Sequence, residues 1–280
     1  MSEEENSSAA DALRQAILEA LGEIEACISA PTLTAADVHL ARRAAKRARA
    51  LARLAPPDLA ALARNTRNTV DRARRALGQA READVRAATL EALKPRLGEA
   101  HATLARLAAG EASAEARAVD LQSIREDIAA LMRDWRLCET RGGLDDIIAA
   151  AGMTYRRMRK RAKAARDGES EALHRWRRTV VDFEYDAGFL AGFAPDMKAT
   201  RVNADRLRRR LGEINDLDDL SSFVRERDAP EDARPAIADL EKATRARRAQ
   251  LLKRAVAHAE ELLEKKPRDW IRSVRRSCGR

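Results

Sequence analysis

Aromatic residues are scarce in this chain, which has three tryptophans, two tyrosines and four phenylalanines among 280 residues. Proteins that bind single-stranded nucleic acid commonly stack bases on aromatic side chains, so this composition argues against such a platform. The cysteines Cys27, Cys138 and Cys278 lie far apart and have neither zinc-binding nor redox spacing. We therefore expect three free thiols in a reducing compartment.

Long apolar runs are missing as well. No stretch approaches the ~18 uninterrupted apolar residues of a membrane-spanning helix, and the acidic, polar start MSEEENSSAA does not match a signal peptide. Apolar residues do not alternate with a period of two, so no β-sheet is expected. These absences predict a cytoplasmic, all-α protein without membrane contact. They give no indication of the oligomeric state.

Positive charge is in excess. Lysine and arginine number 54 against 45 aspartates and glutamates, which gives a net charge of +9 and a pI near 9.9. Such a balance suits nucleic acid, anionic lipid or another polyanion, without choosing among them. A GC-rich genome would also enrich arginine and alanine, but it would not sort charge onto one face of a helix.

The sorted charge lies in the stretch from Asp37 to Leu54. Its basic residues follow one another at steps of three and four, which places them on one helical face: His39, Arg42, Lys46, Arg49 and Arg53. Arg43 and Arg47 widen this face, and no carboxylate interrupts it between His39 and Arg53. Like charges one turn apart repel each other. We therefore expect an anionic partner to offset the repulsion.

The remaining pattern is helical throughout. We expect residues 1–9 to be a disordered tail, Thr34 to be an N-cap, and Gly78 and Gly212 to end helices. The clearest boundary candidate is Gly142-Gly143, which divides the chain into a first bundle (10–140) and a second bundle (141–280). The expected helices span residues 10–29, 37–54, 59–77, 79–107 with a bend or split at Pro95 and Gly98, 112–137, 144–150, 154–166, 171–193, 197–211, 217–225 and 237–265.

Two motifs occur twice. VHLARRAAKRARA around His39 corresponds to LHRWRRTVVDFEY around His174, and RARRALGQAREADV corresponds to RLRRRLGEINDLDD. The offsets from His39 to His174 and from Gly78 to Gly212 agree to within one residue. Agreement in order, motif and spacing predicts an internal duplication, with equivalent basic helices meeting near a pseudo-twofold axis.

Carrying these motifs, the sequence resembles the CHAD domain family over about residues 10–276. The resemblance rests on the basic residues that follow His39, on LGQAREADV, on His174 with Arg177, Arg178 and Tyr185, and on LGEINDLDDL. It implies one domain of two four-helix bundles that binds inorganic polyphosphate, that is associated with polyphosphate granules in bacteria, and that is not an enzyme. It implies neither a metal nor a cofactor. Other polyanions remain candidate partners.

The residues expected to contact polyphosphate are basic side chains on the repeated helices. They are His39, Arg42, Arg43, Lys46, Arg49, Arg74, Arg75, Arg156, Arg159, Lys160, His174, Arg177, Arg178, Arg208 and Arg209. Arginine forks form paired bonds to phosphate oxygens, whereas lysine acts as a point charge. For Arg74, Arg75, Arg208 and Arg209 the sequence leaves open whether they contact phosphate or pack against an acidic residue.

The second half departs from the family pattern. Val181 and Glu184 stand where the family usually has lysine or arginine. We expect this half either to bind phosphate more weakly or to use Arg156, Arg159 and Lys160 instead.

Residues outside these motifs receive structural interpretations. We expect Asp84, Asp216 and Asp218 to orient arginines rather than bind metal, the three tryptophans to lie in the core or at a seam, and His101 and His258 to be structural or surface residues.

Two other functions compete with polyphosphate binding. The first is nucleic-acid binding. The second is metal-dependent hydrolysis of polyphosphate or triphosphate, although neither a GxxxxGK[ST] phosphate loop nor an HExxH metal motif is present.

Overall fold

The computed structural model describes residues 3–30, 33–77, 82–109, 121–227 and 230–278, and every regular element within them is helical. The prediction of an all-α protein is therefore confirmed for these residues. The elements are α1 (Glu3–Ile28), α2 (Ala35–Leu51), η1 (Pro57–Leu59), α3 (Ala60–Ala76), α4 (Glu82–Leu97), α5 (Ala100–Ala109), α6 (Leu121–Leu137), α7 (Leu144–Ala164), α8 (Ser170–Leu190), α9 (Met197–Arg225), η3 (Glu231–Ala233), α10 (Arg234–Leu262) and α11 (Pro267–Cys278).

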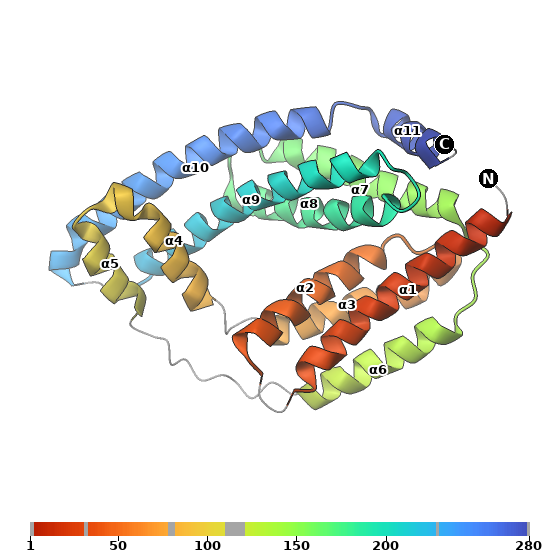
Figure 1. Ribbon diagram of the computed structural model, residues 1–280. Helices are drawn as coiled ribbons and strands as arrows, with labels where there is room; N and C mark the ends of the chain where they lie inside the picture. Colours follow the sequence, from red (N-terminus) through yellow and green to blue (C-terminus); the bar gives the residue numbers. More distant parts are fainter. Residues whose placement is uncertain (1–2, 31–32, 78–81, 110–120, 228–229, 279–280) are drawn as a thin grey trace.

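The helices form two groups of four that lie side by side (Figure 1). One group contains α1, α2, α3 and α6, and the other contains α7, α8, α9 and α10. Helices α2 and α8 pack against each other and join the groups, while α11 covers α7. The internal duplication itself stays a prediction.

Helices α4 and α5 pack away from the half of the sequence to which we assigned them. They contact each other, α9 and α10 instead of the helices of the first group (Figure 1). The guanidinium of Arg86 on α4 stacks 3.9 Å from the ring centroid of Phe223 on α9. The expected bend occurs at Gly98, whose φ of 52° ends α4 one turn after Pro95.

Helix α2 begins as its sequence predicts. The Thr34 hydroxyl accepts a hydrogen bond from the Asp37 backbone N–H, and the Asp37 carboxylate accepts one from the Thr34 backbone N–H. This capping box satisfies two backbone donors at the helix start. The opposite face buries alanines, including Ala41, Ala45 and Ala48, whose small side chains let neighbouring helices approach closely.

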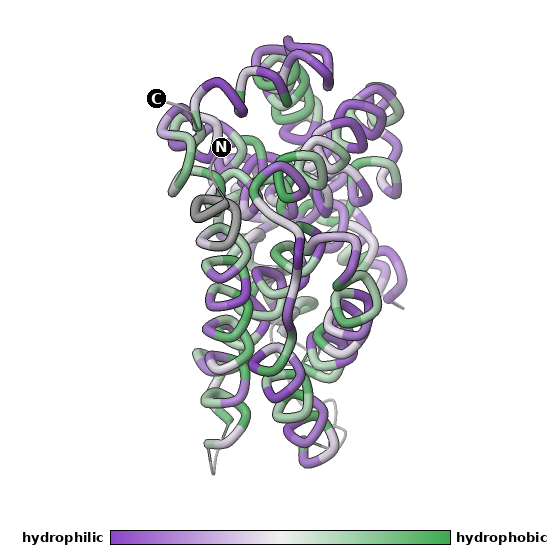
Figure 2. Tube along the Cα trace, turned by 90° about the vertical axis from the view of Figure 1, so that its right-hand side faces the viewer, coloured by the Kyte–Doolittle hydropathy of each residue, from purple (hydrophilic) through white to green (hydrophobic). Residues whose placement is uncertain are grey.

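The core is continuous across both groups and includes all three tryptophans, as expected. Trp176 is fully buried, and Trp270 on α11 stacks on Tyr155 of α7 with ring centroids 4.9 Å apart. The helices alternate between hydrophilic and hydrophobic residues along their length (Figure 2), which is the pattern of amphipathic helices around a shared core. Among the described helices, none combines the length and the apolar character needed to cross a bilayer.

Several predicted helix ends are wrong. The predicted tail 1–9 belongs to α1 from Glu3 onward. Because Ala9 and Ala10 are buried, the apolar face extends from Leu13 toward the N-terminus, and adding further residues to an existing helix costs little free energy. Two predicted helices merge into α7, and two others merge into α9 through Gly212. Gly212 does not end a helix, because buried apolar contacts on both sides of it outweigh the low helix propensity of glycine.

Three other expected breaks have different outcomes. The helix expected from residue 237 begins earlier, at Arg234, and Pro235 lies in its first turn, where proline is tolerated. Gly143 precedes α7 and confirms the break expected there, and a side chain at Gly142 would clash with Pro56. Gly78 lies outside the described residues.

Candidate functional site

The basic stripe of α2 lies where α2, α3 and α8 meet. Arg42 donates a hydrogen bond to the Leu77 carbonyl oxygen over 3.1 Å, which satisfies an acceptor at the C-terminal end of α3. In the last turn of α2, Arg49 reaches both neighbouring helices. Arg53 follows just beyond the helix end.

Arg49 is the most enclosed residue of this stripe, with an exposed fraction of 5%. Its guanidinium lies 2.8 Å from the Asp182 carboxylate on α8 and 3.5 Å from Asp71 on α3. Although burial opposes its charge, these two carboxylates raise the pKa of Arg49. The side chain therefore connects the two helix groups and is held by acids rather than directed to solvent.

Partly exposed arginines gather around this buried pair. We call them the arginine cluster: Arg53, Arg67, Arg74, Arg157, Arg161 and Arg178. Partial burial and the charges of Arg53 and Arg157 lower the pKa of Arg67. Burial and the charges of Arg157 and Arg178 likewise lower the pKa of Arg161. The arginines are therefore close enough to repel one another, and an anion would relieve the repulsion.

Two carboxylates balance part of this charge. Asp71 lies 3.4 Å from Arg74, and Asp182 lies 3.4 Å from Arg53 as well as contacting Arg49. Burial, followed by the charges of Arg49 and Arg178, lowers the pKa of Arg74, which Asp71 opposes. These acids hold the guanidinium groups in position without neutralising them all.

His174 borders the cluster on α8, where the Asn215 amide donates to its Nδ1 over 2.9 Å. Burial and the charges of Arg178 and Arg177 lower the pKa of His174, so its ring is neutral near pH 7 without an anion beside it. His39 is exposed near the start of α2. Arg74, Arg178 and His174 are thus the predicted contact residues that the structure brings together around Arg49.

Other predicted contact residues are engaged elsewhere. Arg208 forms ion pairs with Asp205 and, over 2.6 Å, with Glu184, while Arg209 lies 2.9 Å from Asp205. Glu184 stands where the family usually has lysine or arginine, and its carboxylate neutralises Arg208 in the second half. Of the open alternatives for Arg208 and Arg209, the structure shows packing against an acid.

Of the α7 residues that we expected to compensate, Arg159 is engaged away from the cluster. Arg159 donates to the carbonyl oxygens of Leu263 and Lys265 at the end of α10. Arg156 and Lys160 are exposed. Arg157 and Arg161, on the other side of α7, join the cluster instead.

Two further predicted contact residues are engaged by other partners. Arg43 donates to the Tyr185 hydroxyl on another side of α2, and the Arg177 guanidinium lies against Gly212. Lys46 is half-buried on α2, and Arg75 is exposed on α3.

The sequence list omitted four members of the cluster: Arg53, Arg67, Arg157 and Arg161. The spacing of Arg67, Asp71 and Arg74 places them on one face of α3, which was a usable signal. Arg157 and Arg161 are also one turn apart. Periodicity groups such residues on a face but does not tell which face meets a basic neighbour.

The structural interpretations are mostly confirmed. Asp218 lies 2.7 Å from Arg248 of α10 and orients it, His258 contacts the Asn203 carbonyl oxygen, and His101 contacts Glu91. Cys27, Cys138 and Cys278 form no disulfide with one another. Nothing is described of the Asp84 side chain, which therefore stays a prediction.

This geometry defines an all-α protein in which two helix groups share an arginine cluster. The family model of the CHAD domain matches residues 12–225, so the chain belongs to the CHAD domain family. Its structure is similar to the crystal structure of the CHAD domain from the plant Ricinus communis, with a TM-score of 0.58 and 18% identity over 97% of this chain and 93% of that one. At this identity the likeness concerns the fold alone. A search of curated protein sequences found no match. The family is associated in general with polyphosphate and triphosphate binding.

Proposed function

We propose that this chain is a non-catalytic protein that binds inorganic polyphosphate at the arginine cluster and thereby associates with polyphosphate granules. The observation that carries the proposal is the convergence of arginines from α3, α7 and α8 and from the end of α2 around the carboxylates of Asp71 and Asp182. Membership of the CHAD domain family supports it.

Polyphosphate suits this surface because it is a flexible thread with about one negative charge per internal phosphate. Guanidinium forks pair with phosphate oxygens, and successive arginines along the helices can follow the thread. Binding would release counterions from the thread, as it does from nucleic acids, so affinity should fall steeply with salt. Since no base needs to be read, the scarcity of aromatic residues is no obstacle.

The cluster can be tested by removing three of its positive charges. We expect Arg53→Ala combined with Arg67→Ala and Arg157→Ala to lower the affinity for long-chain polyphosphate at least tenfold. The slope of log affinity against log salt should become shallower by about 2, because three phosphate contacts are lost. Titration of polyphosphate at several salt concentrations, followed by fluorescence anisotropy of a labelled chain, measures both quantities.

The matched control removes the same charge elsewhere, with Arg133→Ala, Arg136→Ala and Arg245→Ala, all exposed. If this control loses as much affinity as the cluster variant, net charge rather than the cluster governs binding and the proposal is wrong. Duplex DNA that competes at equal phosphate concentration would instead favour nucleic-acid binding.

A further inference from the structure

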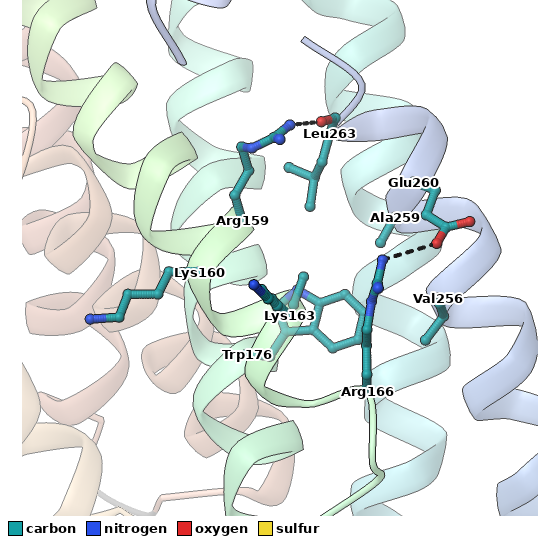
Figure 3. Close-up of a pocket in the computed structure, with 10 residues that line it drawn as sticks. Arg159, Lys160, Lys163, Arg166, Trp176, Val256, Ala259, Glu260 and Leu263 are labelled. Atoms are coloured by element: carbon teal, nitrogen blue, oxygen red, sulfur yellow. Dashed lines mark hydrogen bonds and ion pairs between the residues drawn. The ribbon is translucent and has the colours of Figure 1, made fainter. Parts of the chain in front are cut away.

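A pocket of about 430 Å³ lies between α7, α8 and α10 (Figure 3). On α7, Arg159 and Lys163 line it from the helical face opposite Arg157 and Arg161, and Arg166 adds to it just beyond the helix end. None of the six arginines of the cluster lines the pocket. Its volume falls within the range of small-molecule sites, roughly 300–1,000 Å³.

The pocket has one basic wall and one apolar wall. Three cationic residues of α7 and Arg166, just beyond its end, line it against a single carboxylate, Glu260. The facing wall is apolar and comes from the end of α10, with Val256, Ala259 and Leu263. Such a surface matches a ligand that has an anionic end and an apolar body.

The cations of the pocket differ in how they are already engaged. Arg159 donates to carbonyl oxygens at the end of α10, so its role there is structural. Arg166 lies 3.2 Å from Glu260, and both side chains are exposed, so this pair is weak. Lys163 forms no ion pair with any described residue. Lys163 and Arg166 are thus available to an anion.

The floor of the pocket provides an independent indication of a ligand. Trp176 of α8 lines the pocket, its side chain is fully buried, and its Nε1–H has no hydrogen-bond partner in the described part of the chain. Figure 3 shows its indole between the basic and apolar walls. Buried indole N–H groups usually find an acceptor. A ligand oxygen that enters after a small shift of the floor would supply one.

We propose that this pocket binds a small organic phosphate, with the phosphate on Lys163 and Arg166 and the apolar group against the α10 wall. The guanidinium fork and the ammonium together suit a group with two negative charges. Inorganic phosphate would leave the apolar wall in water. The apolar group comes from either of two sources, a nucleobase or a short acyl chain, which the test separates.

Calorimetric titration of the full chain tests the ligand class with three probes: AMP, a short-chain lysophosphatidate below its micelle concentration, and inorganic phosphate. We expect one or both organic phosphates to bind with one molecule per chain and at least tenfold more tightly than inorganic phosphate. If neither organic phosphate binds, or if inorganic phosphate binds equally well, the proposal is overturned.

Variants test the location. Lys163→Ala with Arg166→Ala should weaken binding of the organic phosphate at least tenfold, whereas Lys253→Ala with Arg254→Ala, exposed on α10 outside the pocket, should not. Val256→Trp should also weaken binding, because it fills the pocket without changing its charge. Circular dichroism and polyphosphate titration establish that each variant is folded and that the cluster is intact. Equal loss in the control, or loss through Arg53→Ala with Arg157→Ala, would overturn the assignment.

Discussion

Two carboxyl groups one turn apart on α8 have opposite surroundings. Asp182 forms ion pairs with Arg49 and Arg53. Asp186 is fully buried, and neither of its oxygens has a hydrogen-bond partner of normal geometry among the described residues, although the Thr154 hydroxyl lies beside it. Burial and then the charge of Asp182 raise the pKa of Asp186 well above its ordinary value. Asp186 therefore keeps its proton to a higher pH than an ordinary aspartate does.

This protonation makes stability depend on pH. Above about pH 5 the unfolded chain has ionised this aspartate, whereas the folded chain keeps its proton until the pH reaches the raised pKa of the buried group. Unfolding then releases a proton, so stability falls as pH rises, by at most ~1.4 kcal/mol per pH unit. The asparagine in Asp186→Asn carries no charge in either the folded or the unfolded chain. We therefore expect the free energy of unfolding of this variant, measured in urea, to rise relative to that of the parent protein as the pH increases from 5 to 7. If the stability of the two proteins changed with pH in the same way, a raised pKa of Asp186 would be contradicted. Arg53 and Arg157, whose charges favour the ionised form of Asp186, are present in both proteins, so they do not affect the comparison.

At the scale of elements, α2 and α7 show how much of a helix its sequence predicts. The N-cap of α2, its basic stripe and its alanine face all follow from periodicity and composition, because these are local properties. Helix α7 carries arginines on two faces, and periodicity does not tell which face lies toward the arginines of the cluster and which lines the pocket with α10. The sequence therefore selected Arg156, Arg159 and Lys160, whereas packing brings Arg157 and Arg161 to the cluster.

The contact between α7 and α11 depends on one residue without a side chain. A Cβ at Gly152 would lie 2.5 Å from Ile271 Cδ1. We expect Gly152→Leu to displace α11 and to cost ~1–3 kcal/mol, as overpacking generally does. Hydrogen exchange should increase in α11, where Trp270 stacks on Tyr155.

Ala149→Leu adds a similar side chain on an exposed part of α7 and serves as the control. Equal protection of α11 in the parent protein and in Gly152→Leu would show that Ile271 adapts to the larger residue without displacing the helix.

At the scale of the whole molecule, a buried ion pair joins the two helix groups. Arg49 on α2 and Asp182 on α8 are each 5% exposed and are 133 residues apart in the chain. Removing one member of such a pair leaves a charge in a poorly hydrated place, which is strongly destabilising, whereas replacing both by apolar residues is often neutral.

We therefore expect Arg49→Met to lower the free energy of unfolding by about 3 kcal/mol. Adding Asp182→Leu should recover most of this loss. Urea unfolding of the parent protein, both single variants and the double variant provides the coupling energy. Additive effects of the two substitutions would contradict a direct pair.

The sequence by itself determined the all-α class, the amphipathic faces, the cap of α2, the positive stripe and the resemblance to the CHAD domain family. All of these depend on residues within a few turns of one another or on motifs read in order. The tertiary structure alone decided that Arg49 is buried against Asp182, that Glu184 neutralises Arg208, that Arg67, Arg157 and Arg161 converge, and that α4 and α5 pack on α9 and α10. The physical reason is that helical periodicity places side chains around one axis, whereas the burial and charge of each side chain depend on how the axes pack.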